Sequence, residues 1–173
     1  MKVVTTPMCQ EIVILAGVSD FIVSTDPDST DADLAVVLWE TKTTKPSFRV
    51  KLNTFSQIID SIRALADEVG THNHKLNLDH YVPPKDEERK KIKVKVYSNF
   101  LKDIVVDMGF SLVEDEADFL VYPDYFRKKI SDEIEVAGER AIEIPSHKNA
   151  PVDPLKRTHL RYNILEERLC TRL

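Results

Sequence analysis

A thiol beside the expected start of a helix is the side chain of this sequence best suited to chemistry. Thr6 is a suitable N-cap and Pro7 suits a first helical position, which would place Cys9 in the first turn. Backbone N–H groups and the helix dipole lower the pKa of a thiol there and favour the nucleophilic, metal-binding thiolate. Because cysteine is among the most frequently buried residue types, simple packing is the alternative.

A second set of polar side chains follows the strand expected to end near Trp39. Functional groups of parallel sheets gather at the carboxyl ends of strands, so this set is expected beside the Thr6 loop, where it would bind a small anion or a cofactor. The alternative is ordinary loop chemistry, with Trp39 covering an interface. The cofactor itself is left open. The candidate cofactor-binding residues are Thr6, Cys9, Gln10, Glu40, Thr41 and Lys42.

Histidines gather in the loop over residues 71–84. His72, His74 and His80 lie there with Asp79, and a His-x-His pair with a third ligand is a donor set for a transition metal. Metal ligands more often sit on rigid elements with supporting hydrogen bonds, so a solvated polar loop is the alternative.

The C-terminal tail from His147 to Leu173 is the one basic region. It would dock an acidic partner or a phosphate-bearing cofactor, or else fold back on its own lobe as a terminal amphipathic helix. Its basic residues are Lys148, Lys156, Arg157, Arg161, Arg168 and Arg172.

Composition excludes several protein classes. The chain has 173 residues, 42% of them hydrophobic, and a net charge of −5 from 24 basic and 29 acidic residues, which is ordinary globular composition. Neither half of the sequence carries a large excess of positive charge, which disfavours binding of nucleic acids through their phosphates. With no long apolar stretch and no C-x-x-C spacing, the sequence predicts a cytoplasmic protein that does not enter a membrane.

The glycine and serine patterns argue against common enzyme classes. All four glycines, Gly17, Gly70, Gly109 and Gly138, are expected just after helices, where a left-handed residue ends them. None is left for a dinucleotide-binding or P-loop motif, and no nucleophile elbow supports a Ser-His-Asp triad.

An internal duplication is indicated by two copies of a strand, helix, strand, strand unit. A shift of 92 residues aligns Val4 with Val96 and Gly17 with Gly109, and a shift of 85 aligns residues 32–36 with 117–121. The copies define a first lobe over 1–82, a charged linker over 83–91 and a second lobe over 92–173.

Further elements complete the expected fold. We expect helices over 53–69, 124–137 and 155–169, and a closing strand over 140–144. Short apolar runs separated by single helices predict an α/β fold: two half-Rossmann-like repeats with mainly parallel sheets, plus a C-terminal helix. Functional groups are then expected at the strand ends, at residues 5–10, 39–42, 97–99, 122–125 and 146–149.

The second half resembles one lobe of nitrogenase component-1-like proteins. The resemblance rests on Asp118-Phe119-Leu120-Val121, the helix after it, the segment 141–145 and the segment 161–167. It implies a Rossmann-like lobe of the kind that assembles around metalloclusters or tetrapyrroles, although the ligand motifs of that family are absent. The whole chain is similar to small conserved proteins of methanogenic archaea, some of which serve nickel-enzyme maturation.

Two hypotheses about function follow. The first is a non-catalytic binding or assembly protein that acts through an interlobe surface, in metallocofactor or methanogenesis-related enzyme maturation, with a protein partner or a small anionic ligand. The alternative is a small enzyme or cofactor carrier that uses Cys9 at a helix N-terminus in an interlobe cleft. The oligomeric state is left open.

Overall fold

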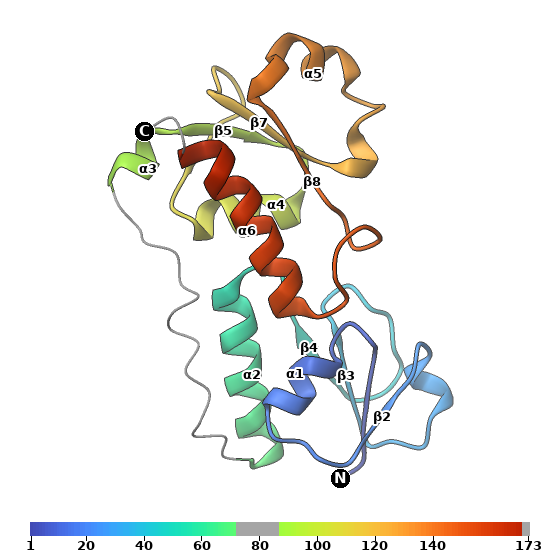
Figure 1. Ribbon diagram of the computed structural model, residues 1–173. Coiled ribbons are helices and arrows are strands. Elements are labelled where there is room, and N and C mark those ends of the chain that lie inside the picture. The colour runs from blue at the N-terminus through green and yellow to red at the C-terminus, as the bar shows by residue number, and fades with distance from the viewer. Residues whose placement is uncertain (72–86, 171–173) are drawn as a thin grey trace. The chain divides into compact units, whose positions relative to one another are not determined.

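The computed structural model describes residues 1–71 and 87–170 (Figure 1). The chain divides into two compact units, Met1–Val82 with Val152–Leu155 and Pro83–Pro151 with Lys156–Leu173. Each unit holds one four-stranded sheet in which all strands are parallel. The predicted α/β class, with two half-Rossmann-like units and a C-terminal helix, is therefore confirmed.

The first unit has the strand order β2-β1-β3-β4. Its strands are β1 (Val3–Thr5), β2 (Phe21–Val23), β3 (Leu34–Leu38) and β4 (Ser47–Val50). Its helices are α1 (Gln10–Leu15), the 3-10 turn η1 (Pro27–Ser29) and α2 (Phe55–Val69). Helices α1 and α2 contact each other and share one apolar core, which also includes Val3 and Val36 of the sheet. The opposite face buries a smaller cluster of Val4, Ala35 and Val37.

The second unit has the same arrangement, with the strand order β6-β5-β7-β8. Its strands are β5 (Lys93–Val96), β6 (Ser111–Leu112), β7 (Phe119–Pro123) and β8 (Ala141–Ile144). Its helices are α3 (Glu87–Lys91), α4 (Asn99–Asp107), the 3-10 turns η3 (Asp124–Phe126) and η4 (Gly138–Arg140), α5 (Ser131–Ala137) and α6 (Pro154–Cys170). Figure 1 shows α5 on the face of this sheet opposite to α4.

Helix α3 falls within the segment expected to be a charged linker, and Arg89 ties it to the rest of the second unit. This side chain is buried, with 4% exposed, and it donates to Glu166 of α6 at 2.5 Å and to the carbonyl of Met108 at 3.3 Å. Its guanidinium lies over the Phe110 ring. Arg89 is thus a buried cation whose charge and hydrogen bonds are compensated.

Most helices begin and end near the capping residues and glycines that the sequence indicates. Thr54 and Ser98 cap α2 and α4 by accepting hydrogen bonds from Gln57 N and Leu101 N, as Ser and Thr do at N-caps. Gly17 and Gly109 have φ values of 84° and 88°, the left-handed conformation expected of residues that end helices.

Three predictions about secondary structure need correction. The helix expected over 124–137 is interrupted: η3 ends at Phe126 and α5 begins only at Ser131, because the backbone of Ile130, with φ −124° and ψ 28°, leaves the helical region. Strand β4 was not expected, since Ser47–Val50 is short and only half apolar. The third correction is to the number of residues that separates the first strands of the two copies.

The first strands of the two copies are offset by 91 residues rather than 92. β1 pairs Val3 with Leu34, whereas β5 pairs Val94 with Phe119, so Val3 corresponds to Val94. The offset of the glycines after the helices remains 92, from Gly17 to Gly109. The second copy therefore has one more residue than the first between its first strand and the glycine that follows its helix. The shared topology is what a duplication would produce, and the duplication itself stays a prediction.

Candidate functional site

The start of α1 differs from the expected thiol site. Cys9 N donates to the Thr6 carbonyl at 2.9 Å, which closes a tight turn, and the helix begins only at Gln10 with Cys9 as its N-cap residue. Thr6 therefore caps no helical N–H, and its buried Oγ1 has no hydrogen-bond partner within the described chain. Gln10 is exposed on the first turn of the helix.

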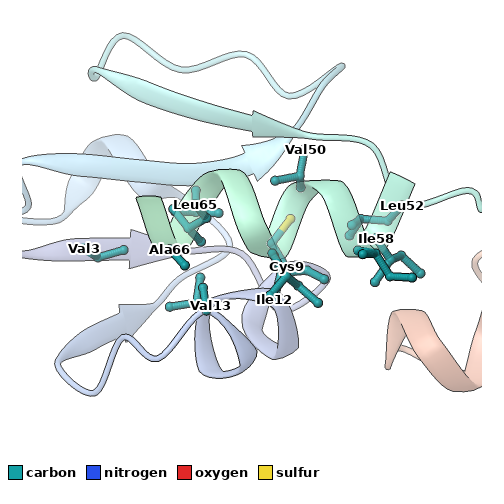
Figure 2. Close-up of a cluster of buried hydrophobic side chains, with 13 residues drawn as sticks. Val3, Cys9, Ile12, Val13, Val50, Leu52, Ile58, Leu65 and Ala66 are labelled. Atoms are coloured by element: carbon teal, nitrogen blue, oxygen red, sulfur yellow. The ribbon is translucent and has the colours of Figure 1, made fainter. Parts of the chain in front are cut away.

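Cys9 lies inside the core of the first unit. Its side chain has no exposed surface and belongs to the apolar cluster that includes Ile12, Val50 and Ile58 (Figure 2). Both Cys9 and Cys170, which the structure describes, lie outside disulfides. A thiol in this setting is shielded from reagents in solution.

The Glu40–Lys42 segment is held by neighbours on its own side of the first unit. Arg49 donates to the carbonyls of Trp39 and Thr41, both at 2.8 Å. Further along the same loop, Asp28 of η1 accepts from Thr43 Oγ1 at 2.5 Å and from the Thr44 backbone. Glu40 and Lys42 are exposed to solvent, whereas Thr41 is half-buried. These contacts fix the loop, and none of them runs to Thr6 or Gln10.

The proposed metal ligands His72, His74 and His80 lie outside the described residues. Within residues 1–71 and 87–170, no group of three or more histidine, cysteine, aspartate or glutamate side chains is arranged to hold a metal ion. The helices of the same residues include none with the length and apolar character needed to cross a lipid bilayer.

The carboxyl ends of the strands in the second unit do bring polar groups together. Asp124, which follows β7, accepts three hydrogen bonds through Oδ2: from Ser146 N at 3.0 Å, Ser146 Oγ at 3.1 Å and Asn149 Nδ2 at 2.6 Å. Burial raises the pKa of Asp124, but these hydrogen bonds outweigh it and hold the pKa below its ordinary value. Asp124 is therefore an ionised anchor that joins the ends of β7 and β8.

Arg161 of α6 lies over the same edge of the sheet. Its Nε donates to the carbonyl of Pro145 at 3.1 Å, directly after β8, and its guanidinium carbon lies 4.7 Å from the ring centroid of Phe100 in α4. The residue has no exposed surface. Its Nη1 and Nη2 atoms are also buried, and neither has a hydrogen-bond acceptor within the described chain. Arg161 is thus a buried cation whose two terminal nitrogens lack acceptors.

The electrostatic surroundings of Arg161 are unfavourable to its charge. Burial lowers the pKa of Arg161 from its ordinary value to about 10, and the nearby positive charge of Arg157 acts in the same direction. The carboxylate of Asp124 opposes this shift only in part. Arg157 has 1% of its surface exposed and donates to the carbonyl of Pro151 at 3.0 Å. Two buried guanidinium groups therefore act on each other from successive turns of one helix.

The sequence singles out the basic C-terminal tail, but it does not show that arginines of this tail are buried. The sequence leaves open whether the basic tail docks an acidic partner or a phosphate-bearing cofactor or folds back on its own lobe, and arginine is a residue type that is rarely buried. The spacing held a signal of burial: Arg161 shares the three- and four-residue steps of the buried face of α6. That face carries Thr158, Arg161, Tyr162, Leu165 and Leu169.

Comparison with known proteins gives no matching family model and no match among curated proteins.

Proposed function

We propose that this chain is a non-catalytic binding protein whose second unit recognises an anionic group, a phosphate or a carboxylate, at the carboxyl edge of its sheet. The observation that carries the proposal is Arg161: a guanidinium without exposed surface, whose Nη1 and Nη2 have no acceptor in the described chain. A buried polar group without a partner costs free energy, and a buried cation costs more.

An oxyanion is the ligand that fits this arrangement best. The terminal nitrogens of a guanidinium match two oxygens of a carboxylate or phosphate and donate to them together. A bound negative charge would also offset the repulsion between Arg161 and Arg157. The strand ends of an open parallel sheet are where such folds bind ligands.

Asp124 and Phe100 would position the arginine rather than bind the ligand. Phe100 supports the guanidinium from one side through a cation–π contact. The carboxylate of Asp124 attracts the guanidinium while its own hydrogen bonds hold Ser146 and Asn149 in place. Both contacts favour a rigid arginine, which loses little conformational entropy on binding.

Binding is proposed in preference to catalysis because Arg161 supplies charge and hydrogen-bond donors, while the nearby Ser146 hydroxyl serves to hold Asp124 at the strand end. Of the two cysteines in the described residues, Cys9 belongs to the apolar core of the other unit, and Cys170 is the last residue of α6, more than two helical turns beyond Arg161. An accessory role in the maturation of a metallocofactor enzyme, with a protein partner, agrees with a binding function and stays part of the proposal. The alternative of an enzyme that uses Cys9 would require that thiol to become accessible.

The proposal is tested by calorimetric titration with inorganic phosphate and, separately, with citrate. Arg161→Met keeps the length and apolar stem of the side chain but removes the charge. Lys148→Met removes an exposed cation from the same strand-end segment and serves as the matched control. We expect phosphate or citrate to bind the wild-type chain and the control alike, with at least tenfold weaker binding to Arg161→Met. Equal binding by Arg161→Met and wild type would overturn the proposal.

A further inference from the structure

A groove of about 380 Å³ lies on the α5 side of the second sheet. Its apolar lining includes Phe119 and Leu120 of β7 and Val136 of α5, and Lys95 of β5 also lines it. Val136 is 82% exposed, the largest exposure among the large hydrophobic side chains of the described residues. A valine so exposed on a short helix contributes little to the core of its own unit.

The groove exists because one short helix covers this face of the sheet. α5 has seven residues, and the cluster it forms centres on Leu120, Tyr122 and Ile130. Parallel sheets are normally covered on both faces. Beside α5, strand β5 presents Lys95 instead of an apolar side chain, and its amino group is held by Glu133 at 2.9 Å. The uncovered part of the face is therefore apolar at its centre and charged around it.

The charge around the groove is strongly negative. Six acidic and two basic side chains line it. Glu133 is occupied by Lys95 and by the hydroxyl of Tyr97, and these hydrogen bonds hold its pKa below the ordinary value. Asp115 and Glu116, by contrast, make no side-chain hydrogen bond or ion pair within the described part of the chain, and both are exposed.

A bare metal ion does not account for this charge, since the described residues hold no group of carboxylates arranged for one. The combination of an apolar centre and a negative rim instead matches a chain segment with an aliphatic side chain between basic ones. The aliphatic group would cover Val136 and Leu120, and lysine or arginine side chains would meet Asp115 and Glu116.

We propose that this groove is a docking site for a basic segment of a protein partner, with an aliphatic anchor seated against Val136. The surface is distinct in its residues from the anion site at Arg161, and the inference does not rest on that proposal. Complementary charge would speed encounter with the partner and set its orientation, while the apolar contact would supply most of the affinity.

The test uses a fluorescein-labelled peptide of about ten residues in which lysine and leucine alternate, with binding followed by fluorescence anisotropy. The triple variant Glu114→Gln, Asp115→Asn, Glu116→Gln removes three of the six negative charges that line the groove. The control Asp20→Asn, Asp67→Asn, Glu68→Gln removes the same charge from exposed positions of the first unit. We expect the rim variant to bind the peptide roughly tenfold more weakly and the control to bind within about twofold of wild type.

The apolar centre has its own variant and control. Val136→Lys places a cation in the groove, and Val106→Lys does the same at a 56% exposed valine of α4 in the same unit. We expect Val136→Lys alone to abolish binding, and a peptide with serine in place of leucine to bind at least tenfold more weakly. Equal losses in the rim variant and its control would overturn the proposal. So would equal losses at Val136 and Val106.

Discussion

The guanidinium of Arg161 lies over the ring of Phe100, 4.7 Å from its centroid, and this contact joins α6 to the first turn of α4. It fixes the arginine at the edge of the sheet where β5, β7 and β8 end. The contact stabilises the position of the cation but supplies no acceptor for Nη1 or Nη2. An arginine that is held in place in this way, and whose two terminal nitrogens still lack acceptors within the described chain, is suited to bind a ligand.

Replacing Arg161 is expected to preserve stability. Arg161→Met should leave the free energy of unfolding within about 1 kcal/mol of wild type or raise it, because the substitution removes a buried charge whose Nη1 and Nη2 lack acceptors within the described chain. Urea denaturation followed by circular dichroism measures the change. A loss greater than about 2 kcal/mol would assign Arg161 a structural role.

Arg89, in the same unit, is a buried arginine whose hydrogen bonds are satisfied, so its replacement should lower stability. Arg89→Met should lower the free energy of unfolding by about 2 to 3 kcal/mol, because this buried guanidinium is paired with Glu166 and bonded to the carbonyl of Met108. The same urea titration applies. Indistinguishable stability of the Arg89→Met and Arg161→Met variants would argue against the contrast drawn between the two arginines.

Asp124 should make stability depend on acid pH. Because the pKa of Asp124 is below its ordinary value of 3.8, the folded state gains stability from the ionised carboxylate, and this gain is lost as the pH falls below about 4. Asp124→Asn should be less stable than wild type at pH 7, and the difference should shrink at pH 3. A difference that is the same at both pH values would exclude Asp124 as the titrating group.

The thiol of Cys9 should be inert in the folded protein. In a Cys170→Ser background, a disulfide reagent such as dithionitrobenzoate should react with Cys9 only in urea, because its side chain is enclosed by the core of the first unit. Absorbance of the released thiolate follows the reaction. Labelling within seconds at neutral pH without denaturant would favour the alternative of a reactive thiol.

The regular elements were predictable from the sequence because their signals are local. Helix α2 begins one residue after the Thr54 cap and ends before Gly70, as periodicity and capping indicate. The same signals located α6 and the strand ends at Asp124 and Ser146. They overlooked β4, whose assignment depends on pairing with β3 rather than on its own four residues.

The candidate site was less predictable because burial of charge is a tertiary property. The sequence leaves open whether the basic tail docks a partner or folds back on its own lobe, and only the packing of α6 on the rest of the second unit reveals that Nη1 and Nη2 of Arg161 lack acceptors within the described chain. Cys9 was misplaced for a related reason: the turn closed by Cys9 N and the Thr6 carbonyl delays the helix. Nothing in the types of these residues distinguishes that turn from a helix start.

The most direct test of the anion site is a crystal of the full chain soaked in selenate, an oxyanion with an anomalous signal. We predict an anomalous peak whose oxygens lie within about 3 Å of Nη1 or Nη2 of Arg161, and no such peak in crystals of Arg161→Met. Peaks found only at exposed lysines and arginines, with none at Arg161, would contradict the account.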